Sequence, residues 1–164
     1  MNAVLEKLSS YNIFNYLFPG IVFVVIAETL TTFSFIQEDI ILGLFLYYFI
    51  GLVISRIGSL VLEPSLKKLQ FLRFAEYTAF VIASKTDEKI ELFSEINNMY
   101  RTLCSLFLLL IAIRIYDEIT RILPIIYKWN VEVLVIALFI LFVLSYRKQT
   151  QYIKKRIEAV LKKG

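Results

Sequence analysis

The chain has 164 residues, of which 59% are hydrophobic, and 18 basic against 14 acidic residues give a net charge of +4. Soluble domains are usually about 45–50% apolar, so this composition indicates a membrane protein, and the length fits a single domain over residues 1–164. The sequence has no histidine and one cysteine, Cys104. This excludes a disulfide framework, His-based nucleophile arrangements and histidine zinc sites. We therefore expect no cofactor, no metal and no enzyme.

The N-terminal region contains an amphipathic pattern followed by an apolar run. Residues 2–18 predict an interfacial helix, without the basic start and small-residue cleavage site of a signal peptide. A break at Pro19-Gly20 and the preference of proline for a first helical turn predict a first span over about 19–35. After a polar turn, residues 40–62 contain only one charge and are long enough to cross a bilayer core of about 30 Å. Glu63-Pro64 is expected to end or kink this second span.

The middle of the chain is amphipathic and rich in lysine and glutamate. Residues 65–100 predict a cytoplasmic section of two helices, divided at 84–86. Neither glycine nor proline occurs from 87 to 123, so one helix is expected to run from this section into a third span over 102–123. As about 37 residues rise about 55 Å, the helix would extend beyond the membrane as a stalk. The fourth span is expected over 131–146, before a basic tail at 147–164.

The distribution of lysine and arginine predicts the orientation. The turn before the second span has none, the turn around Pro124 has two, residues 65–101 have six, and the tail has seven. The positive-inside rule then places both termini and the middle section in the cytoplasm. The predicted fold is an all-α, multi-pass four-helix bundle with an N-terminal interfacial helix and a cytoplasmic helical hairpin between spans 2 and 3.

Several charged residues fall inside the predicted spans and are candidates for structural or pathway roles: Glu28, Arg56, Arg114, Asp117, Glu118 and Arg121. Glu28 lies roughly 13 Å deep, where a carboxylate either is protonated or hydrogen-bonded, or belongs to a polar pathway. The last four recur on one helix face, so they either neutralise one another or line a polar cavity or pore. Similar estimated depths predict a Glu28–Arg114 ion pair. Arg56 is expected to reach the cytoplasmic interface.

Three further groups suggest contacts rather than chemistry. Small residues spaced along the second span favour close helix packing or oligomerisation: Gly51, Ser55, Gly58 and Ser59. The acidic residues of the middle section form either a solvated face or a docking face for a basic partner: Asp87, Glu88, Glu91 and Glu95. The tail residues Arg147, Lys148, Lys154, Lys155 and Arg156 favour contact with anionic lipid. Nucleic acid is not expected, because no recognition fold accompanies them.

Three stretches carry a resemblance to a protein family. YNIFNYLFPG (11–20), GLVISRIGSLVLEP (51–64) and SEINNMYRTLCSLFLLL (94–110) resemble an uncharacterised family of small bacterial four-span membrane proteins. The architecture is also similar to that of membrane subunits of anti-phage systems such as Kiwa, an analogy of fold rather than of sites. The resemblance implies the bacterial cytoplasmic (inner) membrane and a role in defence or stress.

The leading hypothesis is a non-enzymatic homo-oligomer in the membrane that senses or perturbs the bilayer and couples to a cytoplasmic protein partner. Its expected partners are membrane lipids, further copies of the chain and that soluble protein. The alternative is an ion channel or transporter subunit with a polar path through the oligomer. A membrane-embedded enzyme is disfavoured, because it would have to act without histidine.

Overall fold

The computed structural model describes residues 12–161, and every regular element in this part of the chain is a helix. Most of the predicted interfacial helix, residues 2–18, lies outside the described residues. The elements in chain order, with η marking π-helical segments, are η1 (Ile13–Leu17), α2 (Phe18–Leu30), α3 (Ile40–Ile57), η2 (Gly58–Leu62), α4 (Glu63–Lys68), α5 (Tyr77–Thr86), α6 (Lys89–Ile122), α7 (Pro124–Tyr127) and α8 (Asn130–Leu161).

Three helical stretches are long and apolar enough to cross a membrane: Ile13–Leu30, Ile40–Lys68 and Asn130–Leu161. They coincide with the first, second and fourth predicted spans and agree with the expectation of a membrane protein. The third predicted span lies in α6, whose last turns carry four charged side chains, and it is not one of the three.

The first stretch does not break where the sequence suggested. The helix continues from η1 into α2 through Pro19, which occupies the first turn of α2. In the preceding π turn the Phe18 N–H donates to Ile13 O, and the missing N–H of Pro19 is accommodated at this change of register. The helix ends at Leu30, earlier than the predicted residue 35, and Thr31 has an extended backbone. The hydroxyl of Thr31 donates to Ala27 O at 2.9 Å, an alternative to helical bonding that threonine favours at helix ends.

The second stretch is longer than expected. Asp39 caps α3 by accepting from the Leu42 N–H at 2.9 Å. The helix does not end at Glu63-Pro64 but changes to π geometry over Gly58–Leu62 and continues as α4 to Lys68. It stops where Gln70 adopts a positive φ of 58°, a conformation that cannot continue a right-handed helix.

The predicted middle section of residues 65–100 is only partly helical. Residues 69–76 are not helical, so the expected first amphipathic helix is reduced to α5. The break before the next helix falls at Asp87-Glu88 rather than at 84–86. The long uninterrupted helix predicted from residue 87 is confirmed as α6, whose 34 residues rise about 51 Å.

The core lies where α2, α3 and α6 meet, and its buried side chains are Phe23, Val24, Ala27, Ile54, Leu106 and Leu110. Two glycines allow the first two helices to touch through their backbones. A Cβ on Gly20 would lie 1.8 Å from Tyr47 O, and one on Gly51 would lie 1.7 Å from Tyr16 O. Only glycine fits at such a crossing. The small residues of α3 therefore serve packing within the chain.

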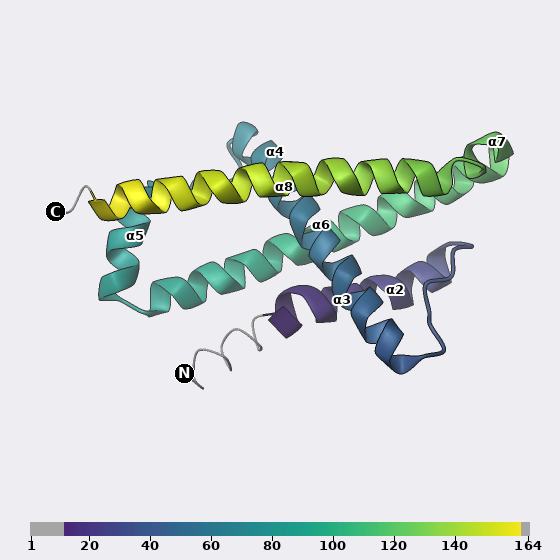
Figure 1. The fold of residues 1–164 in the computed structure, drawn as a ribbon, viewed down its shortest axis with the longest axis horizontal. Helices are drawn as coiled ribbons and strands as arrows, with labels where there is room; N and C mark the ends of the chain where they lie inside the picture. Colours follow the sequence, from purple (N-terminus) through teal and green to yellow (C-terminus); the bar gives the residue numbers. More distant parts are fainter. Residues whose placement is uncertain (1–11, 162–164) are drawn as a thin grey trace.

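Figure 1 shows α6 and α8 running along the length of the molecule, with α3 crossing them obliquely and α5 closing one end. α8 packs on α5 and, less extensively, on α3. The apolar window of α8 has no buried residue within the described structure. This helix therefore presents almost its whole apolar surface outwards.

Candidate functional site

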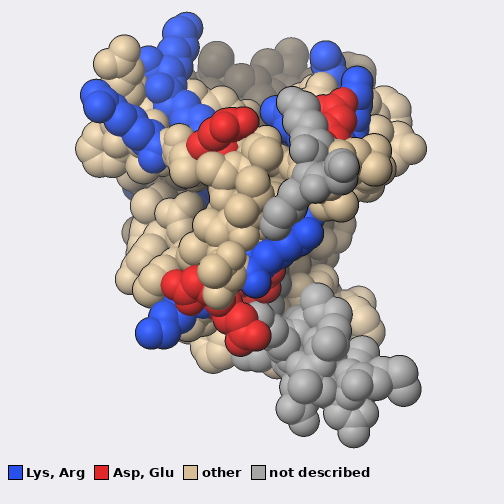
Figure 2. Space-filling model, turned by 90° about the vertical axis from the view of Figure 1, so that its left-hand side faces the viewer, with Lys and Arg blue, Asp and Glu red and all other residues tan. Residues whose placement is uncertain are grey.

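A cavity of about 660 Å³ lies between η1, the α3–α4 helix, α5, the first half of α6 and the end of α8. Its volume is within the range of small-molecule sites. The predicted topology puts this part of the molecule at the cytoplasmic face. Figure 2 views the molecule from the α5 end, where more basic (blue) than acidic (red) surface is visible.

The cavity wall has an unequal charge distribution. Its basic side chains come from four elements and are Arg56, Lys67, Arg101 and Lys155. Glu63 is the one acidic side chain among the described residues of the wall. A concave surface with one sign of charge in excess attracts ligands of the opposite sign.

Glu63 is held by two of these basic groups. It is 6% exposed, and its carboxylate binds Lys67 at 2.9 Å and Arg101 at 2.8 Å. Both carboxylate oxygens are thereby used, which a buried carboxylate needs in order to offset its desolvation. The Glu63–Arg101 pair also joins α4 to α6, and it leaves the buried Arg101 Nε without an acceptor.

The other basic groups of the wall are less compensated. Arg56 Nη2 donates to the neutral hydroxyl of Tyr16 at 3.3 Å, so this contact leaves the guanidinium charge unbalanced. Lys155 forms no ion pair with any residue that the structure describes. Its neighbour Lys154 points elsewhere, towards Glu158 at 3.9 Å.

A buried polar seam continues from the cavity into the apolar core. The Thr102 hydroxyl lies 2.9 Å from Asn98 O, 3.1 Å from Asn15 Oδ1 and 3.3 Å from Ser55 Oγ. Further along α6, the Ser105 hydroxyl donates to Ile54 O at 3.0 Å. These hydroxyls are fully buried and hold η1, α3 and α6 in one register, because a buried polar group without its partner is costly.

Lys148 connects α8 to this part of the molecule. Its ammonium donates to Ser59 O at 2.5 Å and to Ser59 Oγ at 2.7 Å. The local sequence explains why this carbonyl is available. In η2 the Glu63 N–H donates to Gly58 O, and the residue that would donate to Ser59 O in a π-helix, Pro64, has no N–H. Lys148, expected to contact lipid, is thus turned inwards.

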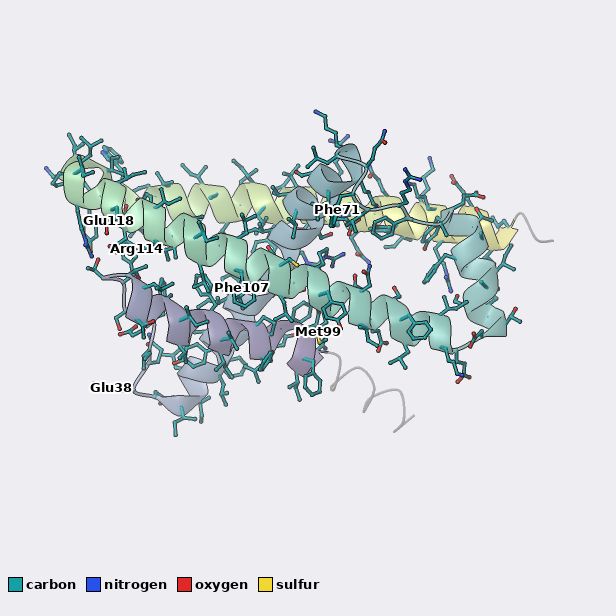
Figure 3. The ribbon with its side chains drawn as sticks, turned by 180° about the vertical axis from the view of Figure 1, so that it is seen from behind. Glu38, Phe71, Met99, Phe107, Arg114 and Glu118 are labelled. Atoms are coloured by element: carbon teal, nitrogen blue, oxygen red, sulfur yellow. The ribbon has the colours of Figure 1, made fainter. Side chains whose placement is uncertain are left out.

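The predicted charged stripe lies at the other end of α6. Asp117 is fully buried, accepts a hydrogen bond from Thr32 and binds Arg121 at 2.9 Å and Arg114 at 3.4 Å. Glu118 pairs with the same two arginines. Figure 3 shows Arg114 and Glu118 beside each other near the α7 end of α6. The stripe is therefore internally paired within the chain.

The predicted Glu28–Arg114 ion pair is wrong for the described structure. The helix ends at Leu30 and the chain turns back, so that Glu28 accepts from Ser34 Oγ at 3.0 Å and from the Phe35 N–H at 3.2 Å. Arg114 is engaged by Asp117 and Glu118 instead. The early helix end, which changes what lies near Glu28, was not predicted.

The remaining predicted residues do not converge on a site. Asp87, Glu88 and Glu91 are exposed around the start of α6, Glu95 is half-buried, and Asp87 accepts from the Lys89 N–H at 3.0 Å. Gly58 packs against Ser105 and Arg101. Arg147 lies with Lys148 beside a second, mainly apolar hollow of about 710 Å³ between η2 and α8. Arg156 is exposed on the last turns of α8.

Sequence reasoning missed the residues that build the cavity and its seam, chiefly Asn15, Glu63, Arg101, Thr102 and Ser105. The available signal was polar side chains within or beside apolar runs; of these residues, only Glu63 was considered, as the end of a helix. Comparison with known proteins adds no further assignment: no family model, no curated protein and no solved structure matches the chain.

Proposed function

We propose that this chain is a non-enzymatic, oligomeric membrane component of a bacterial defence or stress system, and that it transmits a cytoplasmic signal across the membrane domain. In this proposal it crosses the inner membrane four times with both termini in the cytoplasm. The basic cavity is the input site, and α6 carries the response to the opposite end of the molecule.

The observation that supports this most is the continuity of α6. One helix contributes Arg101 to the cavity, Thr102 to the buried seam and Asp117 to the contact with Thr32. The rise from Arg101 to Asp117 is about 24 Å. A shift of α6 at the cavity is therefore transmitted to the Thr32–Asp117 contact, because the intervening residues form one uninterrupted helix.

The pairing of the charged stripe supports a place for α6 in the membrane. Charged groups within spans are tolerated when they pair with one another, and Asp117, Arg114, Glu118 and Arg121 do so. The same pairing favours signal transmission over ion conduction, because it leaves these groups facing one another. The outward apolar surface of α8 supplies the surface for lipid or for a second copy.

The defence role is tested by phage challenge of cells that carry the gene or lack it. We expect the gene to reduce plating of some phages, and Arg101→Gln and Asp117→Asn to abolish that reduction although their positions lie at opposite ends of α6. Lys154→Gln, an exposed change outside the cavity, should keep protection. Unchanged plating across a broad phage panel after deletion would contradict the proposal.

Coupling to a soluble partner has its own test. The intact protein, extracted in mild detergent, is expected to retain a cytoplasmic protein in a pull-down, and reversal of charge at Glu88 and Glu91 should release it. Equal recovery from both proteins would count against the acidic start of α6 as the docking face. Ion flux through purified protein in liposomes, lost in Asp117→Asn, would instead support a channel.

A further inference from the structure

The wall of the cavity described above has more basic than acidic side chains. Arg56 and Lys155 lie in its wall, and neither forms an ion pair with a residue that the structure describes. Glu63, the one acid among the described residues of the wall, is already bound by Lys67 and Arg101. An anion that entered the cavity would therefore meet donors whose bonding capacity is still available.

The arginines favour a phosphate among small anions. A guanidinium presents several N–H donors in a fixed plane that matches the oxygens of a phosphate, and a lysine adds a mobile point charge. Arg101 is suited to this role because Glu63 holds one end of its guanidinium at 2.8 Å while the side chain is still 21% exposed. A positioned guanidinium loses little freedom when it binds.

Part of the wall is aromatic. Tyr77 lies against Phe80 with ring centroids 6.4 Å apart and against Tyr152 at 6.2 Å. On the other side, Lys67 Nζ lies 4.0 Å from the centre of the Phe74 ring. Flat apolar walls beside cationic groups suit a molecule that joins a phosphate to an apolar or planar group.

We propose that the cavity binds the phosphate of a small phosphate ester, with Arg56, Arg101 and Lys155 as its ligands and the aromatic wall receiving the attached group. This deepens the proposed function, because the phosphate ester would be the signal that enters at the cytoplasmic end of α6. Two sources carry this chemistry: a soluble nucleotide, and the headgroup of an anionic phospholipid.

The test uses the full chain in nanodiscs of phosphatidylcholine. AMP is titrated as the soluble probe, with inorganic phosphate and adenosine as its separated parts. In a second set of nanodiscs, phosphatidylglycerol replaces part of the phosphatidylcholine, and co-purified lipid is counted by native mass spectrometry. Saturable binding of AMP identifies a soluble source, and selective retention of phosphatidylglycerol identifies a headgroup; either result supports the site.

Matched variants locate the site. Arg56→Gln with Lys155→Gln is expected to weaken binding of the successful probe about tenfold or more, because both variants remove charge-assisted hydrogen bonds to the phosphate. Arg73→Gln with Lys154→Gln removes the same charge from exposed positions outside the wall and should keep wild-type affinity. If the first pair fails to fold, Lys155→Gln alone is compared with Lys154→Gln, because Lys155 is exposed and forms no ion pair with a described residue.

Binding of neither probe, or an equal loss in both pairs of variants, overturns the proposal. These results are separate from the defence assay. A chain that protects cells but binds no phosphate ester loses this site and keeps its proposed function, whereas a chain that binds phosphate but never affects phage plating keeps the site and loses the defence role.

Discussion

Among the residues that the structure describes, Lys148 and Ser59 form the one polar contact between α8 and the continuous α3–η2–α4 helix. The Lys148 ammonium reaches both the carbonyl and the hydroxyl of Ser59. α8 otherwise has few buried side chains, so this contact and the packing of α8 on α5 together position the basic end of α8, including Lys155, relative to the cavity.

We predict that Lys148→Met destabilises the protein and loosens α8. Two hydrogen bonds from a charged donor are lost and the Ser59 carbonyl is left unpaired, a cost of about 1–3 kcal/mol. Thermal unfolding in detergent measures the loss, and Lys154→Met is the control because Lys154 is exposed and only weakly paired. Equal unfolding temperatures for the two variants would show that the contact contributes nothing.

The effect of Lys148 should depend on Pro64. Pro64→Ala restores an N–H five residues after Ser59, which can donate to the carbonyl that Lys148 otherwise occupies. We therefore expect Lys148→Met to cost less in the Pro64→Ala background than in the wild type. A double-mutant cycle on unfolding free energies measures this coupling; additive effects would mean that the missing N–H is not why Lys148 binds there.

The crossing of the first two helices predicts a sharp difference between two glycines of α3. Gly51→Ala would place a Cβ 1.7 Å from Tyr16 O, which forces the helices apart and costs about 1–3 kcal/mol or more. At Gly43 the nearest atoms to a Cβ are 3.4 Å away, in the Tyr47 ring, and alanine there gains about 0.8–1.0 kcal/mol of helix propensity.

Yield of monodisperse protein and unfolding temperature should therefore fall for Gly51→Ala and stay level or rise for Gly43→Ala. The same loss at both positions would indicate that α3 tolerates no alanine in general, rather than a backbone contact at Gly51.

The charged stripe predicts that its two acids are not equivalent. Asp117 is fully buried and receives Thr32 as well as two arginines, whereas the Glu118 side chain is 45% exposed. Asp117→Asn keeps the shape but removes the charge that faces both arginines, so its unfolding temperature should fall well below that of Glu118→Gln, because exposed ion pairs contribute little. Similar unfolding temperatures would place Asp117 in a solvated environment.

Periodicity and composition predicted the features that depend on neighbouring residues. The helical content, three apolar membrane-length helices and the uninterrupted α6 could all be predicted from apolar runs and from the absence of glycine and proline after residue 87. The turn chemistry was harder to predict. Pro19 and Pro64 were expected to interrupt helices. Each instead follows a π-helical segment, and the helix continues through the proline although its N–H is missing.

The candidate site could be predicted only in fragments. Arg56 and Lys155 were singled out, but for lipid or interfacial contacts, and Glu63 was read as a helix end. Their meeting depends on α4 continuing past Pro64, on the positive φ of Gln70 and on the angle at which α3 crosses α6. None of these has a periodic signature: the turn at Gln70 is made by local bonds such as that from the Phe71 N–H to Leu66 O at 3.0 Å, and the crossing of α3 and α6 depends on residues far apart in the chain.

The sequence alone determined that the chain is helical and suited to a membrane, because long apolar runs that cross a bilayer must satisfy their backbone polar groups within helices. The tertiary structure decided which charges neutralise one another and which remain available. Glu28 turned to its own loop, the stripe on α6 paired internally, and the basic groups around Glu63 were left in excess. Which charged groups pair depends on distances between crossing helices. These distances are set by helix packing and cannot be read from neighbouring residues in the sequence.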